Sequence, residues 1–306
     1  MEAWQRNIAS SHQIRELIKL MTPQTLVENI DQLVSLPDIC IRVNQMMDPA
    51  NYSAAGVAEI IAQDADISAR LLRLVNSSLF SQQSKVETIS RAVAIVGTDE
   101  LRNLVMATTA VRTFTGIPGE LMNMTDFWRH SVTTGVMSQI LASHCNTLHS
   151  ERLFVMGMLH DVGRLVIYLT LPDKAKEMLW LTGGDDWILS ETEQELLGFT
   201  HMDVGAELIR SWGLPDSLES VIRNHHRPTE ASDHQLETSL VHIALALANG
   251  EMVGLSIDEM LWAIHPSAWE TTGLSPTIVA SMVDDMLAKT AEVMNLVVAP
   301  LERMHG

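Results

Sequence analysis

Apolar residues recur along most of this chain at the spacing of an α-helix, and the alternation typical of β-strands is scarce. The segment with Ile67, Leu71, Leu72 and Val75 is a clear case, because these residues stand at i, i+4, i+5 and i+8. The 18 methionines, the many alanines and leucines, and the 2 tyrosines suit helix packing better than a pleated sheet. The pattern predicts an all-α fold.

Capping and breaking residues indicate where the helices begin and end. Residues 11–35 are expected to form one or two amphipathic helices that break near Thr22 and Pro23. The expected side-chain caps are hydroxyl residues at four later helix starts, Ser53, Thr98, Thr125 and Ser150. Breaks are expected at 36–38, 48–49, 76–78, 97, 183–186, 213–215, 228–234, 254–256 and 273–276. Two or three helices should fill the chain after residue 234.

Composition limits the classes of function. The 306 residues include 20 Lys and Arg against 38 Asp and Glu, a formal net charge of −18. Nucleic acid and anionic membranes attract clustered basic residues, so neither is expected as a partner. Two cysteines, Cys40 and Cys145, are too few for a disulfide framework and fit a reducing compartment. No apolar leader follows Met1 and no uncharged apolar run approaches about 20 residues, so we expect a soluble cytoplasmic protein.

The pair His160-Asp161 stands inside an otherwise apolar stretch from Leu153 to Ile167. A helix that is apolar on every side is a core helix, so we expect this pair to be buried midway along one helix that starts after Ser150. An ionised carboxylate that is buried without a partner costs several kcal/mol. A metal ion, a cationic side chain or a hydrogen-bonding group must therefore stabilise Asp161.

Three further histidines are expected to face the core. His130 shares the apolar face of its helix, His225 continues a stripe that begins at Leu218, and His201 opens another helix. His226 should point about 100° away from His225. A single inward histidine is more often a hydrogen-bonded core residue, but several beside one buried aspartate favour a site for Zn, Fe or Mn. The remaining histidines are interpreted as surface or packing residues: His12, His144, His149, His234, His242, His265 and His305.

The order of these motifs resembles the HD superfamily of metal-dependent phosphohydrolases. The residues that carry the resemblance are His130, His160-Asp161, His201-x-x-x-Gly205, the Trp-Gly-Leu-Pro segment 212–215, and His225-His226. Upstream, the chain is similar to the HDOD domain, the HD-related output domain of bacterial signalling proteins, at Leu36-Pro37, 63–77 (QDADISARLLRLVNS), 89–93 (ISRAV) and Val96-Gly97. The resemblance implies six metal ligands: His130, His160, Asp161, His201, His225 and His226.

The resemblance also implies a domain plan. It predicts an HD-type multi-helix bundle with an N-terminal helical subdomain, over residues 28–228. The helical subdomain is expected at 28–118 and the HD-like subdomain at 119–228. Residues 1–27 and 229–306 are expected to be helical extensions.

The chain departs from the pattern of active HD enzymes in the last metal ligand. Those enzymes carry an Asp on a later helix, and Leu245 occupies that position here. An apolar side chain does not coordinate a metal, and His242, one turn earlier, is a weak substitute. The Gly-Tyr-Pro segment of the relatives that cleave cyclic di-GMP is replaced by 227–229 (RPT). Arg164, where the family has a basic residue, could contact a phosphate or neutralise Asp161.

Three interpretations stay open. The first is a bacterial signal-transduction module without turnover, which binds signalling proteins or a small ligand and keeps a degenerate metal pocket. The second is a metal-dependent phosphohydrolase of a nucleotide or cyclic nucleotide, with catalytic roles for Asp161 and Arg164. The third is a sensor that binds a small nucleotide without cleaving it. The incomplete ligand set favours the first, and the ligand types favour Fe or Zn over Mn or Mg.

Overall fold

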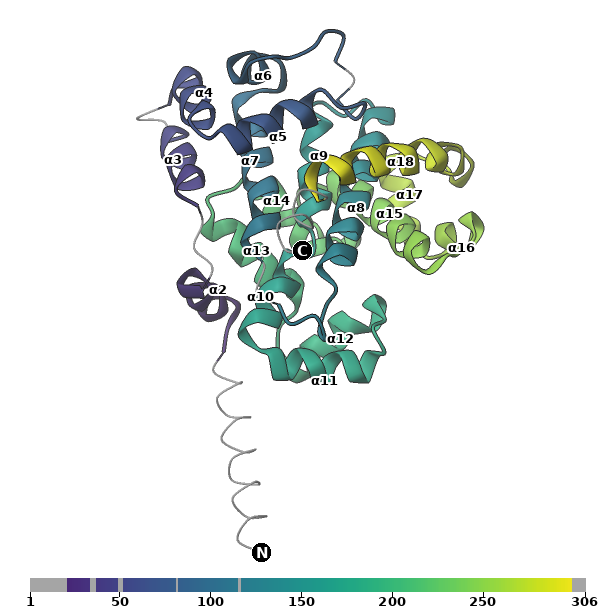
Figure 1. The fold of residues 1–306 in the computed structure, drawn as a ribbon. Helices are drawn as coiled ribbons and strands as arrows, with labels where there is room; N and C mark the ends of the chain where they lie inside the picture. Colours follow the sequence, from purple (N-terminus) through teal and green to yellow (C-terminus); the bar gives the residue numbers. More distant parts are fainter. Residues whose placement is uncertain (1–20, 34–36, 49–51, 81, 115–116, 299–306) are drawn as a thin grey trace, which may run out of the picture.

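The computed structural model describes residues 21–33, 37–48, 52–80, 82–114 and 117–298. Within these residues every regular element is a helix, which confirms the predicted all-α fold (Figure 1). The first helices are α2 (Pro23–Leu33), α3 (Asp38–Met46), α4 (Ala54–Ala62), α5 (Ala65–Val75), α6 (Ile89–Val96) and α7 (Thr98–Thr113). The central ones are α8 (Met124–His144), α9 (Glu151–Leu159), α10 (Val162–Thr170), α11 (Pro172–Thr182), α12 (Asp186–Leu197), α13 (His201–Ser211), α14 (Asp216–Asn224) and the short 3₁₀ helix η1 (Pro228–Glu230). The last are α15 (Gln235–Val253), α16 (Ile257–Trp262), α17 (Pro266–Thr272) and α18 (Pro276–Val297).

Helix α8 runs through the centre of the fold. Helices α9 and α15 pack along it, and α18 returns to contact both α8 and α5. Figure 1 shows α3 and α4 on one side of α9 and the group α15 to α18 on the opposite side. The carboxylate of Glu292 on α18 accepts the backbone N–H of Ser78 at 3.2 Å. Helix α18 therefore joins the N-terminal helices to the central bundle.

Helix α2 can be compared with the helices expected over residues 11–35 only from residue 21 onward. It begins at Pro23, beside the expected break, and packs against α10 and α13. The earlier part of the expected helices lies outside the described residues, as do His12 and His305. The domain boundaries at residues 27, 118 and 228 stay predictions.

The caps expected for α4 and α7 have different outcomes. Ser53 is confirmed, because its hydroxyl accepts the N–H of Gly56 at 3.0 Å. Thr98 is wrong as a cap, because it is already the first residue of α7. Gly97, with a φ of 100°, ends α6 as expected and also precedes α7. The backbone of a single glycine therefore sets both boundaries.

The caps expected for α8 and α9 also need correction. Thr125 is wrong, because Asn123 caps α8 and accepts the N–H groups of Thr125 at 3.0 Å and Asp126 at 3.4 Å. Asparagine caps as strongly as the hydroxyl residues, and Asn123 stands earlier in the chain. Ser150 holds the expected cap position of α9, but its hydroxyl pairs with Ser143 at 2.9 Å and caps no backbone N–H.

The expectation of one continuous helix through His160-Asp161 is wrong. Helix α9 ends at Leu159, α10 begins at Val162, and the pair forms the turn between them. The His160 ring nitrogen Nδ1 lies 2.7 Å from the carbonyl oxygen of Gly157, the group that would accept the N–H of Asp161 in a continuous helix. Because the side chain competes for that carbonyl, the helix breaks at Asp161.

The pair of helices α9 and α10 forms a long, largely apolar stretch. Glu151–Thr170 is long and apolar enough to cross a membrane by length and composition, although its four charged residues mean that it is not an uncharged run. Its most apolar window is 83% buried inside the fold, which is typical of a core segment in a soluble protein.

The breaks expected later in the chain are largely confirmed. Gly183 and Gly184 have positive φ and separate α11 from α12, and Gly254 and Gly273 end α15 and α17. Four helices rather than two or three follow residue 234. The additional boundary lies at His265, whose side chain accepts the N–H of Ser267 and starts α17.

Candidate metal centre

Glycine contacts bring the histidine-bearing helices unusually close together. A Cβ atom on Gly163 would lie 2.0 Å from the carbonyl oxygen of His201 and 2.5 Å from the backbone N of Gly205. A Cβ atom on Gly157 would lie 2.7 Å from the Cα of Gly135. Only glycine fits at such distances, so α10 approaches α13, and α9 approaches α8, at backbone contact.

These contacts gather the predicted ligands around the turn between α9 and α10. Asp161 is shared by two groups of possible ligands. Within each group, the ligand atoms all lie within 4.8 Å of one another. The first group contains Asp161, His201, His225 and His226, and the second contains His130, His160 and Asp161. The structure therefore brings together all six residues that the sequence indicated.

The hydrogen bonds on Nδ1 aim three imidazoles at Asp161. His160 donates from Nδ1 to the carbonyl of Gly157 at 2.7 Å, and His225 donates to the carbonyl of Ile222 at 2.7 Å. A carbonyl oxygen only accepts, so Nδ1 carries the proton and a neutral ring has its lone pair on Nε2. His201 donates from Nδ1 to Glu193 at 2.6 Å.

The Nε2 atoms surround the carboxylate at short range. Asp161 Oδ1 lies 3.3 Å from His201 Nε2 and 3.6 Å from His225 Nε2, and Oδ2 lies 3.5 Å from His160 Nε2. Asp161 Oδ1 and the Nε2 atoms of His201 and His225 make no hydrogen bond within the described residues. Lone pairs that face a carboxylate in a buried site require a cation, either a proton or a metal ion.

Burial and charge set the protonation of the centre. Burial first, and then the nearby His225 and His130, lower the pKa of His160 to about 3, so its ring is neutral at pH 7. Burial opposes ionisation of Asp161, but the surrounding histidines and Arg164 outweigh it and hold the pKa of that carboxyl well below its usual value. Arg164, which donates to Asp161 Oδ2 at 3.0 Å, is the cation that persists at neutral pH.

Glu193 on α12 is a site residue that the sequence interpretation missed. It is fully buried, and its Oε2 accepts both the backbone N–H of His201 at 2.7 Å and the ring Nδ1–H at 2.6 Å. Burial lowers the pKa of His201, but the Glu193 charge outweighs this and raises it. A signal was present, because Glu193 stands four residues from both Leu189 and Leu197 on the buried face of α12.

The direction expected for His226 is wrong. Its ring centroid lies 4.3 Å from that of His225 and 5.4 Å from that of His201. Helix α14 ends at Asn224, so His226 no longer follows the rotation of a helix and turns back into the cluster. Burial first, and then the nearby histidines, hold the pKa of His226 well below its usual value.

His242 and Leu245 on α15 contribute no atom to either ligand group. His242 donates from Nδ1 to the carbonyl of His225 at 2.8 Å, and its Nε2 accepts the N–H of His265 at 3.1 Å. Burial lowers its pKa to about 4. His242 is thus the packing residue that was expected, and Leu245 is 1% exposed.

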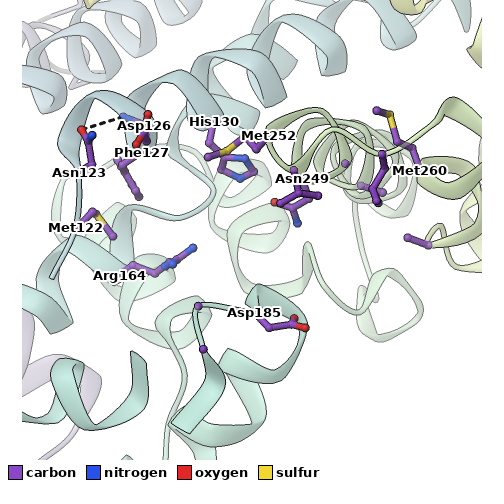
Figure 2. Close-up of a pocket in the computed structure, with 17 residues that line it drawn as sticks. Met122, Asn123, Asp126, Phe127, His130, Arg164, Asp185, Asn249, Met252 and Met260 are labelled. Carbon is purple, nitrogen blue, oxygen red and sulfur yellow. Dashed lines mark hydrogen bonds between the residues drawn. The ribbon is translucent and has the colours of Figure 1, made fainter. Parts of the chain in front are cut away.

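A cavity of about 600 Å³ opens beside this centre (Figure 2). His130 and Arg164 lie in its wall, so the cavity reaches the metal centre from the outside. Its other lining comes from the start of α8, the α11–α12 loop, the end of α15, and α16. The volume falls in the range of small-molecule sites, about 300–1,000 Å³.

Comparisons with known proteins agree with this architecture. The chain is 28% identical over 178 residues to "Cyclic di-GMP phosphodiesterase CdgJ" of Vibrio cholerae, which covers 51% of this chain and 40% of that protein. The curated relatives that it matches are much longer, and the chain spans 40% of their length.

Solved structures show the same fold. A protein of Shewanella amazonensis SB2B named "Putative phosphohydrolase" has a TM-score of 0.70 at 26% identity, over 89% of this chain and 98% of that one. An HDOD domain protein of unknown function from Geobacter sulfurreducens has a TM-score of 0.66 at 24% identity, over 90% and 98%. The family model of the HDOD domain matches residues 33–228. The chain therefore belongs to the HDOD domain family.

Proposed function

We propose that this protein is a signal-transduction module that works by binding and not by enzymatic turnover. A metal ion in the candidate metal centre holds the pocket together. A small ligand in the adjoining cavity, or a signalling protein on the surface, supplies or receives the signal. The observation that carries this proposal is the single carboxylate of the ligand groups, Asp161, together with the buried Leu245 in the position of the last ligand.

Charge balance explains why one carboxylate argues against hydrolysis. A two-metal clamp on a phosphoryl group brings four positive charges into the pocket. Only Asp161 opposes them directly, and it already pairs with Arg164 at 3.0 Å. A single divalent ion is balanced more evenly, because Glu193 adds a second negative charge behind His201. The residues therefore fit one ion better than two.

The donor set indicates which ion. Histidine nitrogens outnumber the carboxylate oxygen, and nitrogen-rich sites favour Fe or Zn over Mn or Mg. Asp161, His201, His225 and His226 form the group that would hold it, and His130 and His160 form the second group at the same carboxylate. When bound, the ion would neutralise Asp161 and supply a Lewis acid at this centre.

Turnover and binding are tested on the same preparation. The purified chain, without a histidine tag, is analysed for metal and assayed against cyclic di-GMP and other nucleotides with added Mn, Fe or Zn. We expect about one ion per chain, loss of that ion in His201→Ala, and no hydrolysis above the His201→Ala background. Phosphodiesterase activity that disappears in His201→Ala would overturn the proposal.

One observation favours hydrolysis as the second candidate. The two ligand groups share Asp161, and a bridging carboxylate is typical of two-metal centres. The Vibrio cholerae relative carries the name of a phosphodiesterase, but 40% of that protein matches this chain. A stoichiometry near two ions per chain, together with turnover, would favour this second function.

A further inference from the structure

We infer that the cavity beside Arg164 selects a small amphiphile with one anionic head group and an apolar body, and disfavours polyanionic nucleotides. The inference rests on the proposed function, since it names the ligand class of the same cavity. Three properties of the lining carry it: the donors near the metal centre, the apolar walls, and the acidic residues at the exposed edge.

Two donors lie at the inner part of the cavity. The Arg164 side chain is 12% exposed and uses Nη1 to pair with Asp161. The Nδ2 atom of Asn249 is buried and makes no hydrogen bond within the described residues. A buried donor without an acceptor costs about 1–3 kcal/mol. Figure 2 shows Arg164, His130 and Asn249 facing one space from α10, α8 and α15. An anionic oxygen in this space would satisfy Asn249 and lie close to Arg164.

The walls are apolar along the rest of the cavity. Phe127 and Met260 are 6% and 7% exposed, and Met122 lies beside the start of α8. At the outer edge Met252 and Leu255 are 44% and 40% exposed, which is unusual for large apolar side chains. Methionine side chains adapt to apolar surfaces of varied shape. An alkyl or aryl body would cover these side chains and gain free energy for each methylene that it buries.

The charged residues of the lining exclude a second anionic group. Arg164 is the basic residue among them, while Asp126 and Asp185 are exposed acids at the outer edge. Phosphate-rich ligands are recognised by several Arg and Lys side chains together. A cyclic dinucleotide would place one phosphate near Arg164 and its second against the acids. The cavity therefore fits one anionic head group and an uncharged tail.

The test is a calorimetric titration of the metal-loaded chain with butyl, hexyl and octyl phosphate, each below its micelle concentration. Inorganic phosphate and cyclic di-GMP are titrated alongside. We expect affinity to rise about fourfold for each added methylene, and inorganic phosphate and cyclic di-GMP to bind at least tenfold more weakly than octyl phosphate.

Two variants test the apolar part and the anionic head group of the ligand separately. Met252→Glu should weaken octyl phosphate at least tenfold, whereas Leu148→Glu, at an 81% exposed apolar residue outside the cavity, should change nothing. Asn249→Ala should weaken every alkyl phosphate by the same factor and leave the dependence on chain length intact. These two results together would locate the apolar and anionic ends of the ligand.

Contrary outcomes are distinguishable. This inference would be overturned if affinity did not depend on the length of the alkyl chain, or if cyclic di-GMP bound more tightly than octyl phosphate. Either result would still support the proposal that the cavity binds a small ligand. The inference would also be overturned if none of the alkyl phosphates bound to the chain. If, in addition, no nucleotide or cyclic nucleotide of a full panel bound, the result would count against the proposed small-ligand function itself.

Discussion

Glu193 and His201 form a buried carboxylate–imidazole pair, in which Oε2 receives both the backbone N–H and the ring Nδ1–H of the same histidine. Both side chains are at most 1% exposed. The pair fixes the ring orientation and leaves Nε2 directed at Asp161. Carboxylates that orient a ligating histidine in this way raise its basicity and its affinity for the ion.

Substitution of Glu193 should therefore weaken metal binding although Glu193 is not a ligand. We expect Glu193→Gln to lower the affinity for Zn about 10- to 100-fold, because the amide accepts a hydrogen bond but carries no charge. Competition with a chromophoric chelator measures the change. Glu191→Gln, at an exposed residue of the same helix, is the matched control. Equal metal affinity in Glu193→Gln and the parent chain would show that Glu193 has only a structural role.

Introduction of a carboxylate at residue 245 tests the incomplete ligand set. Leu245→Asp places a buried charge on α15, so the metal-free variant should be less stable than the parent by several kcal/mol. Added Zn should raise the melting temperature of Leu245→Asp more than that of the parent, since the ion supplies the partner of the new charge. Leu245→Asn is the uncharged control. A melting temperature that responds equally to Zn in all three chains would contradict the ligand position assigned to Leu245.

A methyl group at Gly163 should disrupt the metal centre from the backbone side. The added Cβ would meet the carbonyl oxygen of His201 at 2.0 Å, so α10 and α13 must separate. We expect Gly163→Ala to lower the free energy of unfolding by about 3 kcal/mol, and to reduce metal content. Gly119→Ala is the control, because nothing lies within 4 Å of its Cβ position. Denaturant titration measures the loss of stability, and elemental analysis measures the metal content.

Because His242 is buried, we expect the folded protein to lose stability in acid. Its pKa is lowered from 6.5 to about 4 in the folded protein, so between these values the unfolded chain binds the additional proton. Stability must then fall as the pH is lowered through this window, by up to about 1.4 kcal/mol per pH unit for this residue. Urea unfolding of the metal-free chain at pH 7, 6, 5 and 4 measures the slope. His242→Gln should show a shallower slope, and an unchanged slope would exclude His242 as a source.

Much of the fold and the cluster could be predicted because helical periodicity is a local property. His130 and His225 stand on apolar faces, and the structure places both in the core. The prediction failed where side chains compete for the backbone. His160 takes the carbonyl of Gly157 and breaks the helix, and His226 lies beyond the end of α14. Such contacts at helix ends override the angle expected from spacing alone.

The contact of Glu193 with His201 and the cavity could not be predicted from spacing, for a different reason. The partner of Glu193 lies on another helix, and the turn between α12 and α13 decides which face of α12 meets His201. The cavity is bounded by five segments of the chain, from Met122 to Ala263. Only the packing of α8, α10 and α15 brings their side chains to one space.

The contact of α18 with α8 limits where the chain can be truncated without loss of the fold. The family match ends at residue 228, yet α15 and α18 both cover α8 from beyond that point. A fragment that stopped there would lack the buried α18 residues Val279, Val283 and Met286, and it would uncover the helix that holds His130. The family match thus ends before helices that pack on the central bundle, and we expect fragments that end at residue 228 to aggregate or to lose the pocket.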